Sequence, residues 1–321
     1  MRFVIYGAGA IGGVVGARLA QAGFDVALIA RGAHLEAIRR DGLTLETPVE
    51  RVLLDLPAAE HPAAVDWRQG DVVCLATKSQ DSASALAALK IAAPPGLPIV
   101  CMQNGVENER LALRLFEDVY GAVVMVPAAH LDPGVVQAFG ANLTGMIDIG
   151  RYPHGVDERC EAIACALAAS KFNSRVRADV MRHKYAKLIV NLGNAVEALC
   201  EPGPDADELE RRAREEGRAA LSAAGIEFVA EEVDDVRGRW ERMQVSQIAG
   251  RERAGSSSWQ SLARGSGAIE TDYLNGEIAL LGRLHGVRVP VNAQLCELAD
   301  RVAAAGGSPG QLPAEEVPAA A

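Results

Sequence analysis

Aromatic residues are scarce in this chain of 321 residues, at 4% of the composition. Proteins that bind single-stranded nucleic acids stack bases on aromatic side chains, so this scarcity argues against such a surface. The formal net charge of −10 points the same way, because an acidic chain is repelled by phosphate backbones and by anionic membranes. We therefore expect no nucleic-acid partner and no membrane partner.

Metal-binding cysteine patterns and long apolar runs are also missing. The six cysteines form no CxxC pair, and no cysteine–histidine spacing resembles a zinc site, so we expect no metal. No apolar run has the length of a bilayer, and the first residues predict a strand and a glycine turn rather than a secretory leader. We expect a cytoplasmic protein with reduced thiols.

A glycine motif dominates the start of the chain. The apolar runs Arg2–Tyr6 and Val26–Ala30 flank a glycine turn and a helical pattern, which is the order of a dinucleotide-binding βαβ unit. Gly7 suits the sharp turn, Gly9 the approach of a pyrophosphate, and Gly12 the packing of helix on sheet. A tight turn without a ligand is the alternative, and the strand-to-helix context disfavours it. The predicted cofactor loop comprises Gly7, Ala8, Gly9, Ala10, Ile11 and Gly12.

Arg31 follows the second apolar run. NAD-binding proteins usually carry Asp or Glu at this place for the ribose 2′-hydroxyl, whereas an arginine accommodates a 2′-phosphate. Asp25 lies too early, at the start of the strand. A solvated surface arginine is the alternative. We favour NADP, as NADPH, over NAD.

Strands and helices alternate after Arg31, which predicts a mostly parallel sheet and a Rossmann-type doubly wound α/β domain. Ligands of such sheets bind beyond the carboxyl ends of the strands, where Arg31, Lys78 and Asn104 fall. We expect a shared pocket there, with a solvated surface lysine as the alternative for Lys78. The expected strands are 43–46, 51–54, 71–77, 98–102, 119–126 and 134–139, and the expected helices are 34–41, 82–90 and 107–116.

Helical periodicity dominates from Asp179 onward, with expected helices at 181–200, 207–224, 234–248 and 269–285. The length also favours two domains. We therefore predict an NADP-binding Rossmann domain at 1–178 and an all-helical substrate and catalytic domain at 179–321, with the active site in the cleft between them. The tail after about residue 306 is rich in Ala, Pro and Gly, so we expect it to be disordered.

Lys187, Asn191 and Asn194 follow at intervals of four and three residues, which places them on one face of a helix. Asparagines on an apolar face are costly to bury unless they are hydrogen-bonded, and a substrate rich in oxygen would satisfy them. An exposed polar stripe is the alternative. Two further candidates have plain structural alternatives: Ser257 as a helix cap and Glu270 as a first-turn charge.

As a set, these features resemble the ketopantoate reductases (2-dehydropantoate 2-reductases) over nearly the whole chain, to about Asn292. The resemblance implies NADPH-dependent reduction of a small 2-oxo acid, first of all 2-dehydropantoate to pantoate, as in pantothenate biosynthesis. It also leaves a homodimer open. The motifs that carry it are Gly7–Gly12, Arg31, Lys78, 103–105, 187–194, Ser256–Ser257, 270–276 and 285–290.

The resemblance also implies residue roles. Lys187 would be the catalytic proton donor to the ketone, and Asn191, Asn194 and Ser257 would bind the substrate. The implied cofactor contacts, beside the glycine loop and Arg31, are Lys78, Asn104 on the nicotinamide side, the backbone of Ala129, and Glu270 near both cofactor and substrate.

The chain departs from the family around the substrate. Asn191 and Asn194 are three residues apart where the family usually has four, and Glu197 and Ser261 stand where it commonly has Thr and Asp. Lys184 competes with Lys187 as donor, and we favour Lys187 because we expect Lys184 in a more solvated turn. These departures leave two alternatives open: a related NADP-dependent oxidoreductase acting on another 2-oxo or 2-hydroxy acid, and a non-catalytic NADP-binding sensor.

Overall fold

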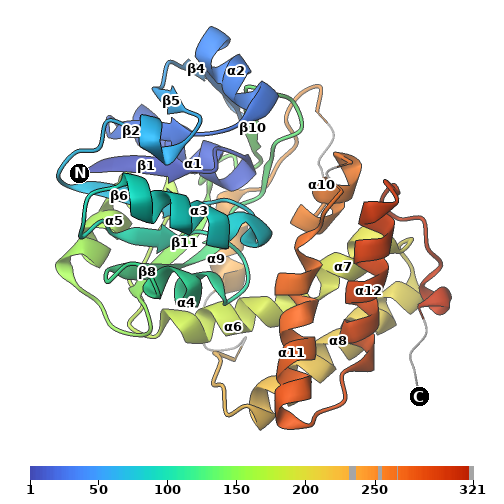
Figure 1. Ribbon diagram of the computed structural model, residues 1–321. Helices are drawn as coiled ribbons and strands as arrows, with labels where there is room; N and C mark the ends of the chain where they lie inside the picture. Colours follow the sequence, from blue (N-terminus) through green and yellow to red (C-terminus); the bar gives the residue numbers. More distant parts are fainter. Residues whose placement is uncertain (231–235, 252–254, 266, 318–321) are drawn as a thin grey trace. The chain divides into compact units, whose positions relative to one another are not determined.

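The computed structural model describes residues 1–230, 236–251, 255–265 and 267–317, and the chain divides into two compact units (Figure 1). The first unit comprises residues 1–181 and 231–253, and the second comprises residues 182–230 and 254–321.

A mixed sheet forms the centre of the first unit. Its strands are β1 (Arg2–Tyr6), β2 (Asp25–Ile29), β5 (Ala58–Ala59), β6 (Asp71–Leu75), β7 (Ile99–Cys101), β8 (Val119–Met125), β11 (Gly145–Arg151) and β12 (Phe172–Asn173). Their order is β12-β11-β8-β7-β6-β1-β2-β5, and among these pairs only β8 and β11 run antiparallel. The run from β5 to β8 has the strand order of a dinucleotide-binding doubly wound sheet, as predicted.

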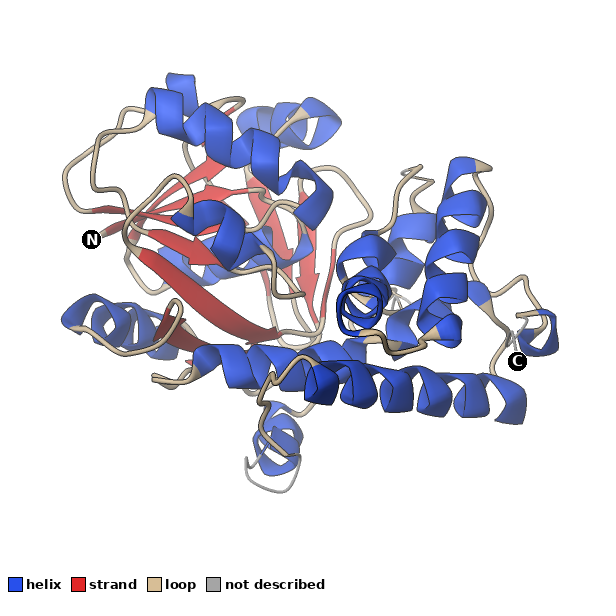
Figure 2. Cartoon of the chain, turned by 60° about the horizontal axis from the view of Figure 1, so that its bottom comes forward, coloured by secondary structure: helices blue, strands red, loops and turns tan. Residues whose placement is uncertain are grey.

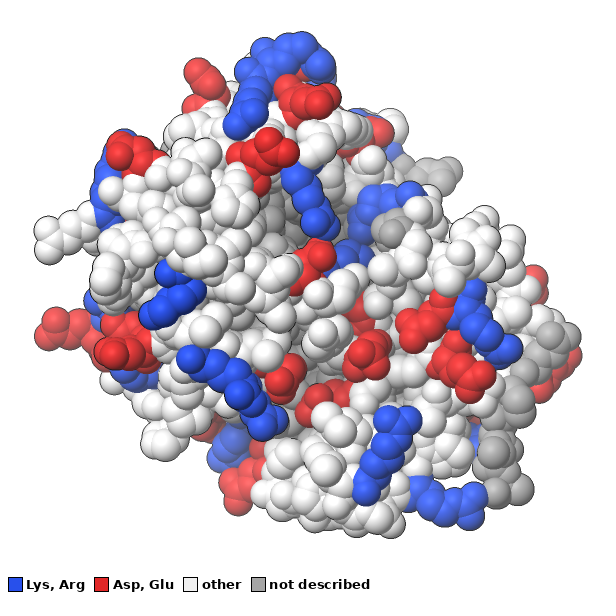
Figure 3. Space-filling model, viewed as in Figure 1, with Lys and Arg blue, Asp and Glu red and all other residues white. Residues whose placement is uncertain are grey.

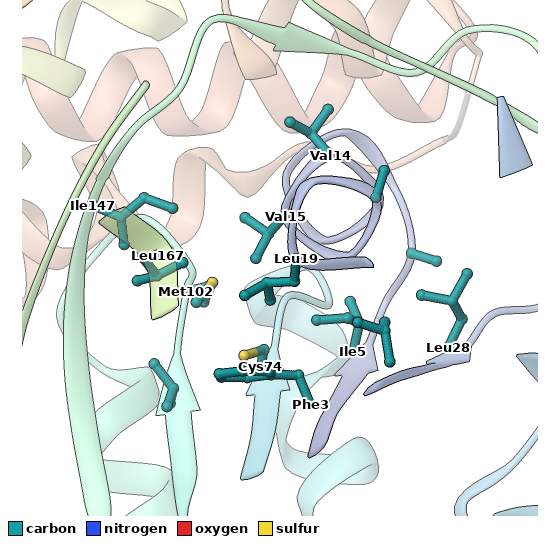
Figure 4. Close-up of a cluster of buried hydrophobic side chains, with 14 of the residues drawn as sticks. Phe3, Ile5, Val14, Val15, Leu19, Leu28, Cys74, Met102, Ile147 and Leu167 are labelled. Carbon is teal, nitrogen blue, oxygen red and sulfur yellow. The ribbon is translucent and has the colours of Figure 1, made fainter. Parts of the chain in front are cut away.

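Helices cover both faces of this sheet because the apolar side chains of its strands alternate in direction (Figure 2). Phe3 and Ile5 of β1 belong to the core beneath α1 and α5, and Val4 belongs to the core beneath α3 and α4. In Figure 4, Val15 and Leu19 point from α1 toward the β1 side chains. The helices in residues 1–179 of this unit are α1 (Ala10–Gln21), α2 (Gly32–Asp41), α3 (Ser79–Ala92), α4 (Asn108–Leu113), α5 (Glu158–Ala169) and the 3₁₀ turn η1 (Pro62–Ala64).

A second, four-stranded sheet holds the predicted hairpin. Its order is β4 (Arg51–Leu54), β3 (Leu43–Glu46), β10 (Val135–Ala138) and β9 (Ala128–Ala129). The hairpin of β3 and β4 is confirmed as antiparallel. The strand expected at 134–139 exists as β10, but it pairs with β3 and β9 and lies outside the main sheet.

Strand β11, helix α5 and strand β12 were not predicted. Gly145, Asp148 and Gly150 are residues that strands usually avoid, so β11 carried no strand signal. The structure explains Gly150, since a Cβ there would lie 2.0 Å from the carbonyl oxygen of Arg177. The presence of Asp148 in this strand is explained by the arginine side chains that form ion pairs with its carboxylate.

Helix α9 (Val236–Met243) corrects the predicted domain boundary, which assigned everything after residue 178 to the helical domain. Arg239 of α9 is 2% exposed and donates to both carboxylate oxygens of Asp148, at 2.5 and 2.8 Å. A buried guanidinium requires such a partner, so the described residues 236–251 pack with the first unit. This contact joins residues 91 positions apart, and helical periodicity carries no sign of it.

The second unit is built from helices, as predicted. They are α6 (Val180–Asn191), α7 (Gly193–Leu199), α8 (Pro204–Ala223), α10 (Ser257–Ala263), α11 (Asn275–His285) and α12 (Pro290–Ala304), with the 3₁₀ turns η2 (Glu270–Tyr273) and η3 (Ala314–Glu316). The helix expected at 181–200 is present as two helices, α6 and α7, with an interruption at Leu192, whose backbone angles remain in the right-handed helical region. Helix α12 was not predicted, although Pro290 suits its first turn.

The tail after residue 306 is ordered as far as residue 317, which corrects the expected disorder. Gly310 N–H donates to the carbonyl oxygen of Ala198 at 3.0 Å, and Leu312 N–H donates to that of Leu199 at 2.9 Å. Val317 is 5% exposed. The end of α7 thus gives the tail hydrogen-bond partners that its own composition did not reveal. Residues 318–321 lie outside the described residues.

Candidate functional site

Four predicted cofactor positions meet at one edge of the main sheet. The glycine loop follows β1, Arg31 follows β2, Lys78 follows β6 and Asn104 follows β7. These four strands are adjacent and parallel, so their carboxyl ends share an edge. The chain leaves β1 for β2 on one side and reaches β6 on the other, which makes this edge the switch point where such sheets bind ligands.

The three glycines of the motif differ in whether the fold itself requires a glycine at that position. Gly7 has a φ of +101°, and a Cβ there would lie 2.7 Å from the backbone of Ala76. A Cβ at Gly12 would lie 2.1 Å from the carbonyl oxygen of Gly7, so folding requires both glycines. A Cβ at Gly9 would meet no atom within 4 Å. Packing therefore does not explain Gly9, and the space beside its backbone suits a ligand.

The start of α1 is suited to an anion. Gly9 is the cap residue and has no side chain to accept from the first N–H groups, and the first turn holds no acidic residue. The unpaired N–H groups and the helix dipole favour negative charge at this end. Together with the open backbone at Gly9, this fits the pyrophosphate of a dinucleotide.

Arg31 precedes α2 and is available to solvent. Its side chain is 81% exposed and forms an ion pair with Asp81, with the two charged atoms 2.9 Å apart. Exposed ion pairs contribute little stability, so a doubly charged phosphate can compete with this carboxylate.

Lys78 and Asn104 are half-buried, and buried polar groups link their segments. The amide nitrogen of Asn108 donates to the Ser79 hydroxyl at 3.0 Å and to the carbonyl oxygen of Asn104 at 3.4 Å. Asn108 and Ser79 were not predicted as site residues. Each lies in the first turn of a helix, shortly after a candidate residue, where a polar side chain is common. Ala129 lies in β9, fully buried, outside the main sheet.

The second unit carries the predicted donor. Burial, and then the charge of Lys184, lower the pKa of Lys187 to about 7. The expected solvation of Lys184 is wrong: this side chain is 3% exposed, whereas Lys187 is half-buried. The polar neighbours of Lys184 suggested a wet turn, but exposure depends on the tertiary packing of α6. A lysine with a pKa near neutrality can both hold and release a proton.

Asn191 ends α6, one turn after Lys187. It is 8% exposed, and its amide nitrogen is buried without a hydrogen-bond partner. An unpaired buried donor costs about 1–3 kcal/mol, so an acceptor placed beside this amide would stabilise it. Asn194 is half-buried and lies in α7, so the interruption at Leu192 separates the two asparagines.

A buried amide network fixes that interruption. The side chain of Asn275 donates to the carbonyl oxygen of Leu192 at 3.1 Å and to the side-chain oxygen of Asn292 at 3.0 Å. Asn292 in turn donates to the carboxylate of Glu216 at 2.9 Å. Helix α8 approaches closely here, since a Cβ at Gly193 would lie 2.5 Å from Glu210. This network therefore holds the backbone at Leu192, between the two asparagines.

Ser257 opens α10, and its neighbour Ser256 is the cap residue, with its hydroxyl oxygen accepting from Trp259 N–H at 3.4 Å. The capping alternative thus applies to Ser256, which leaves the half-buried Ser257 in the first turn. Glu197 of α7 accepts from Ser256 N–H at 3.2 and 3.3 Å, so α7 holds the serine segment. Glu270 is the half-buried first residue of η2.

The structure therefore groups the candidates into two sets. The first unit holds the glycine loop, Arg31, Lys78, Asn104 and Ala129, and the second holds Lys187, Asn191, Asn194, Ser257 and Glu270. Among the described residues, no three His, Cys, Asp or Glu side chains are grouped to hold a metal ion, and no helix has the length and apolarity to cross a membrane. On the face in Figure 3, charges of both signs are interspersed.

Comparisons with known proteins follow this division. The family model described as ketopantoate reductase PanE/ApbA matches residues 3–154, and the model of its C-terminal part matches residues 179–303. The 2-dehydropantoate 2-reductase of Halobacterium salinarum is 31% identical, covering 93% of this chain and 97% of that protein. The enzyme of the same name from Pyrococcus horikoshii is 30% identical, covering 96% and 99%.

Solved structures give the same result. A PanE/ApbA family ketopantoate reductase from Ralstonia eutropha JMP134 has a TM-score of 0.79 and 32% identity, covering 95% of this chain and 99% of that one. A D-mandelate dehydrogenase, solved with NADH and anilino(oxo)acetate, has a TM-score of 0.77 over the same shares of the chains. At 23% identity, the second likeness shows a common fold only.

Proposed function

Because this chain belongs to the ketopantoate reductase family and is an oxidoreductase with a nicotinamide dinucleotide cofactor, we propose that it reduces 2-dehydropantoate to pantoate with NADPH. Pantothenate biosynthesis is the pathway that this reaction would serve. The observation that carries the reaction is the face of α6, where Lys187 has a pKa of about 7 and Asn191, one turn later, has a buried, unpaired amide nitrogen. The relatives are reductases, which disfavours a non-catalytic sensor.

The residues of the first unit bind and orient the cofactor. The N–H groups at the start of α1 would hold the pyrophosphate beside Gly9, and Arg31 would pair with the 2′-phosphate, which is the basis for choosing NADPH. Lys78, Asn104 and the backbone of Ala129 complete the contacts. When bound, the reduced nicotinamide supplies a hydride to the carbonyl carbon of the substrate.

The residues of the second unit act on the substrate. Negative charge grows on the carbonyl oxygen as the carbon is reduced, and the Lys187 ammonium donates a proton to that oxygen. Asn191, Asn194 and Ser257 hold the carboxylate and hydroxyl groups by hydrogen bonds. Glu270 orients the groups around the reacting carbon. Since the ammonium form is the donor, reduction requires Lys187 to be protonated.

Another 2-oxo acid is the second candidate substrate. Glu197, which stands where the family commonly has Thr, uses its carboxylate to hold Ser256 beside the proposed substrate residue Ser257. A change at this contact alters the position of Ser257 and with it the acids that fit.

The test is steady-state reduction of a panel of 2-oxo acids, followed by loss of absorbance of NADPH or NADH. Ketopantoate with NADPH should give the highest kcat/KM, and pyruvate, 2-oxoisovalerate and phenylglyoxylate should give lower values. A higher value for another acid would replace the substrate while keeping the enzyme class. No oxidation of either nucleotide with any acid would refute the proposal.

A further inference from the structure

His34 lies in the first turn of α2 and joins two segments of the first unit. Its Nε2 atom is 2.8 Å from the carbonyl oxygen of Ala8, and its Nδ1 atom is 2.9 Å from the backbone nitrogen of Gly134. A backbone N–H only donates and a carbonyl only accepts, so Nδ1 accepts and Nε2–H donates. The ring is therefore neutral and connects the glycine loop to the segment before β10.

The bond to Ala8 determines the orientation of one peptide unit in the glycine loop. The planar trans peptide places the carbonyl of Ala8 and the N–H of Gly9 on opposite sides, so fixing the carbonyl also fixes the N–H. Gly7 and Gly9 flank Ala8, and glycines permit backbone conformations that other residues exclude. Without a partner for the Ala8 carbonyl, the loop would have to order this peptide unit when the ligand binds.

The surroundings of His34 keep it in the required form. The His130 ring lies against it with a centroid distance of 4.1 Å, and His130 Nδ1 is 3.0 Å from the carbonyl oxygen of Val135. Burial, and then the charge of His130, lower the pKa of His34 to about 4. An imidazolium could not accept from Gly134, so the neutral ring matches its two hydrogen bonds.

We propose that His34 is a positioning residue for the cofactor, holding the Ala8–Gly9 peptide unit in the orientation that binds the pyrophosphate. The proposal rests on the proposed nucleotide binding of this loop. His34 acts on a part shared by NADP and NAD, whereas Arg31, three residues earlier, acts on the 2′-phosphate alone. Preorganisation of this kind raises affinity without adding a contact to the ligand.

Two substitutions of His34 separate its hydrogen bonds. In His34→Gln, the longer side chain places its amide nitrogen near the Nε2 position and retains the donor to Ala8. In His34→Asn, the shorter side chain reaches Gly134 only and loses that donor. His34→Leu removes both bonds, and His61→Leu is the matched control, since His61 is an exposed histidine whose ring accepts from Ala63 N–H in η1.

Dissociation constants for NADPH and NADH should be measured by calorimetry, with the melting temperature and kcat at saturating NADPH alongside. His34→Asn and His34→Leu should weaken both nucleotides by the same factor, about three- to tenfold, with kcat nearly unchanged. His34→Gln should bind within about twofold of the wild type. Unchanged affinity in folded His34→Asn, or equal losses in His34→Gln and His34→Asn, would overturn the proposal. A wild type that binds neither nucleotide would instead refute the proposed function.

Discussion

The two lysines of α6 make the proposed proton transfer testable by pH. Lys187 must be protonated to act as donor, and its pKa is lowered to about 7 by burial and by the charge of Lys184. The rate of reduction should therefore be full below pH 6 and fall as the pH rises through 7. At pH 8 roughly a tenth of the molecules retain the ammonium form, so kcat should be about tenfold below its plateau.

Removing the positive charge of Lys184 should change the pH at which the rate falls. Lys184→Met retains an unbranched side chain of similar length and eliminates the positive charge. The pKa of Lys187 should therefore rise, and the fall in rate should move to higher pH. Above pH 7, the kcat of this variant should therefore be a larger fraction of its low-pH value than the kcat of the wild type is. Lys187→Ala should lose about 10²–10⁴ in kcat at all pH values while NADPH affinity stays nearly constant.

The assay is kcat for 2-oxo acid reduction from pH 5.5 to 9, with saturation by both substrates verified at each pH. Lys90→Met is the control, because Lys90 is an exposed lysine on α3 of the first unit. If the alkaline limb is the same in Lys184→Met and the wild type, Lys187 is not the group that titrates. A near-normal kcat in Lys187→Ala would make Glu270 the next residue to test.

Three further outcomes are expected. Arg31→Ala should weaken the binding of NADPH about tenfold at low salt and the binding of NADH hardly at all, while Asp81→Asn should strengthen the binding of NADPH. Direct titration measures both affinities. An equal loss of affinity for the two nucleotides in Arg31→Ala would exclude a 2′-phosphate contact. Gly9→Ala should melt at the wild-type temperature yet lose affinity for both nucleotides, whereas Gly12→Ala should have a lower melting temperature. Calorimetry measures both quantities. Intact binding in Gly9→Ala would place the pyrophosphate elsewhere. Arg239→Leu should lower the free energy of unfolding by about 3 kcal/mol in urea titrations, because Arg177 alone then pairs with the buried Asp148; partial recovery in the double variant with Asp148→Leu would attribute the loss to this carboxylate.

Local patterns predicted the parts of this protein that depend on neighbours in the chain. The spacing of Gly7, Gly9 and Gly12 specified a turn, a helix start and the strand before it, because these elements are consecutive. The strand ends carrying Arg31 and Asn104 could be placed on one edge because parallel strands in an alternating pattern leave little choice of topology.

Features that depend on distant contacts could not be predicted in this way. The burial of Lys184 comes from the tertiary packing around α6, while its sequence neighbours are polar. The interruption at Leu192 is stabilised by Asn275, 83 residues later, so periodicity alone extended one helix across it. The helix expected at 34–41 gave no sign of a role for His34, because its partners Ala8 and Gly134 lie 26 and 100 positions away.

The return of the chain to the first unit has a consequence for biosynthesis. Translation produces Asp148 91 residues before Arg239, so a nascent chain carries the strand β11 long before its main ionic partner exists. Arg177, whose guanidinium is 3.0 Å from the same carboxylate, is the partner available meanwhile. The first unit therefore reaches its final stability only after α8 of the second unit has been made. A fragment ending at residue 178 contains Arg177 but lacks Arg239, so at this carboxylate it has the ion pairs of an unfinished polypeptide rather than those of the complete first unit.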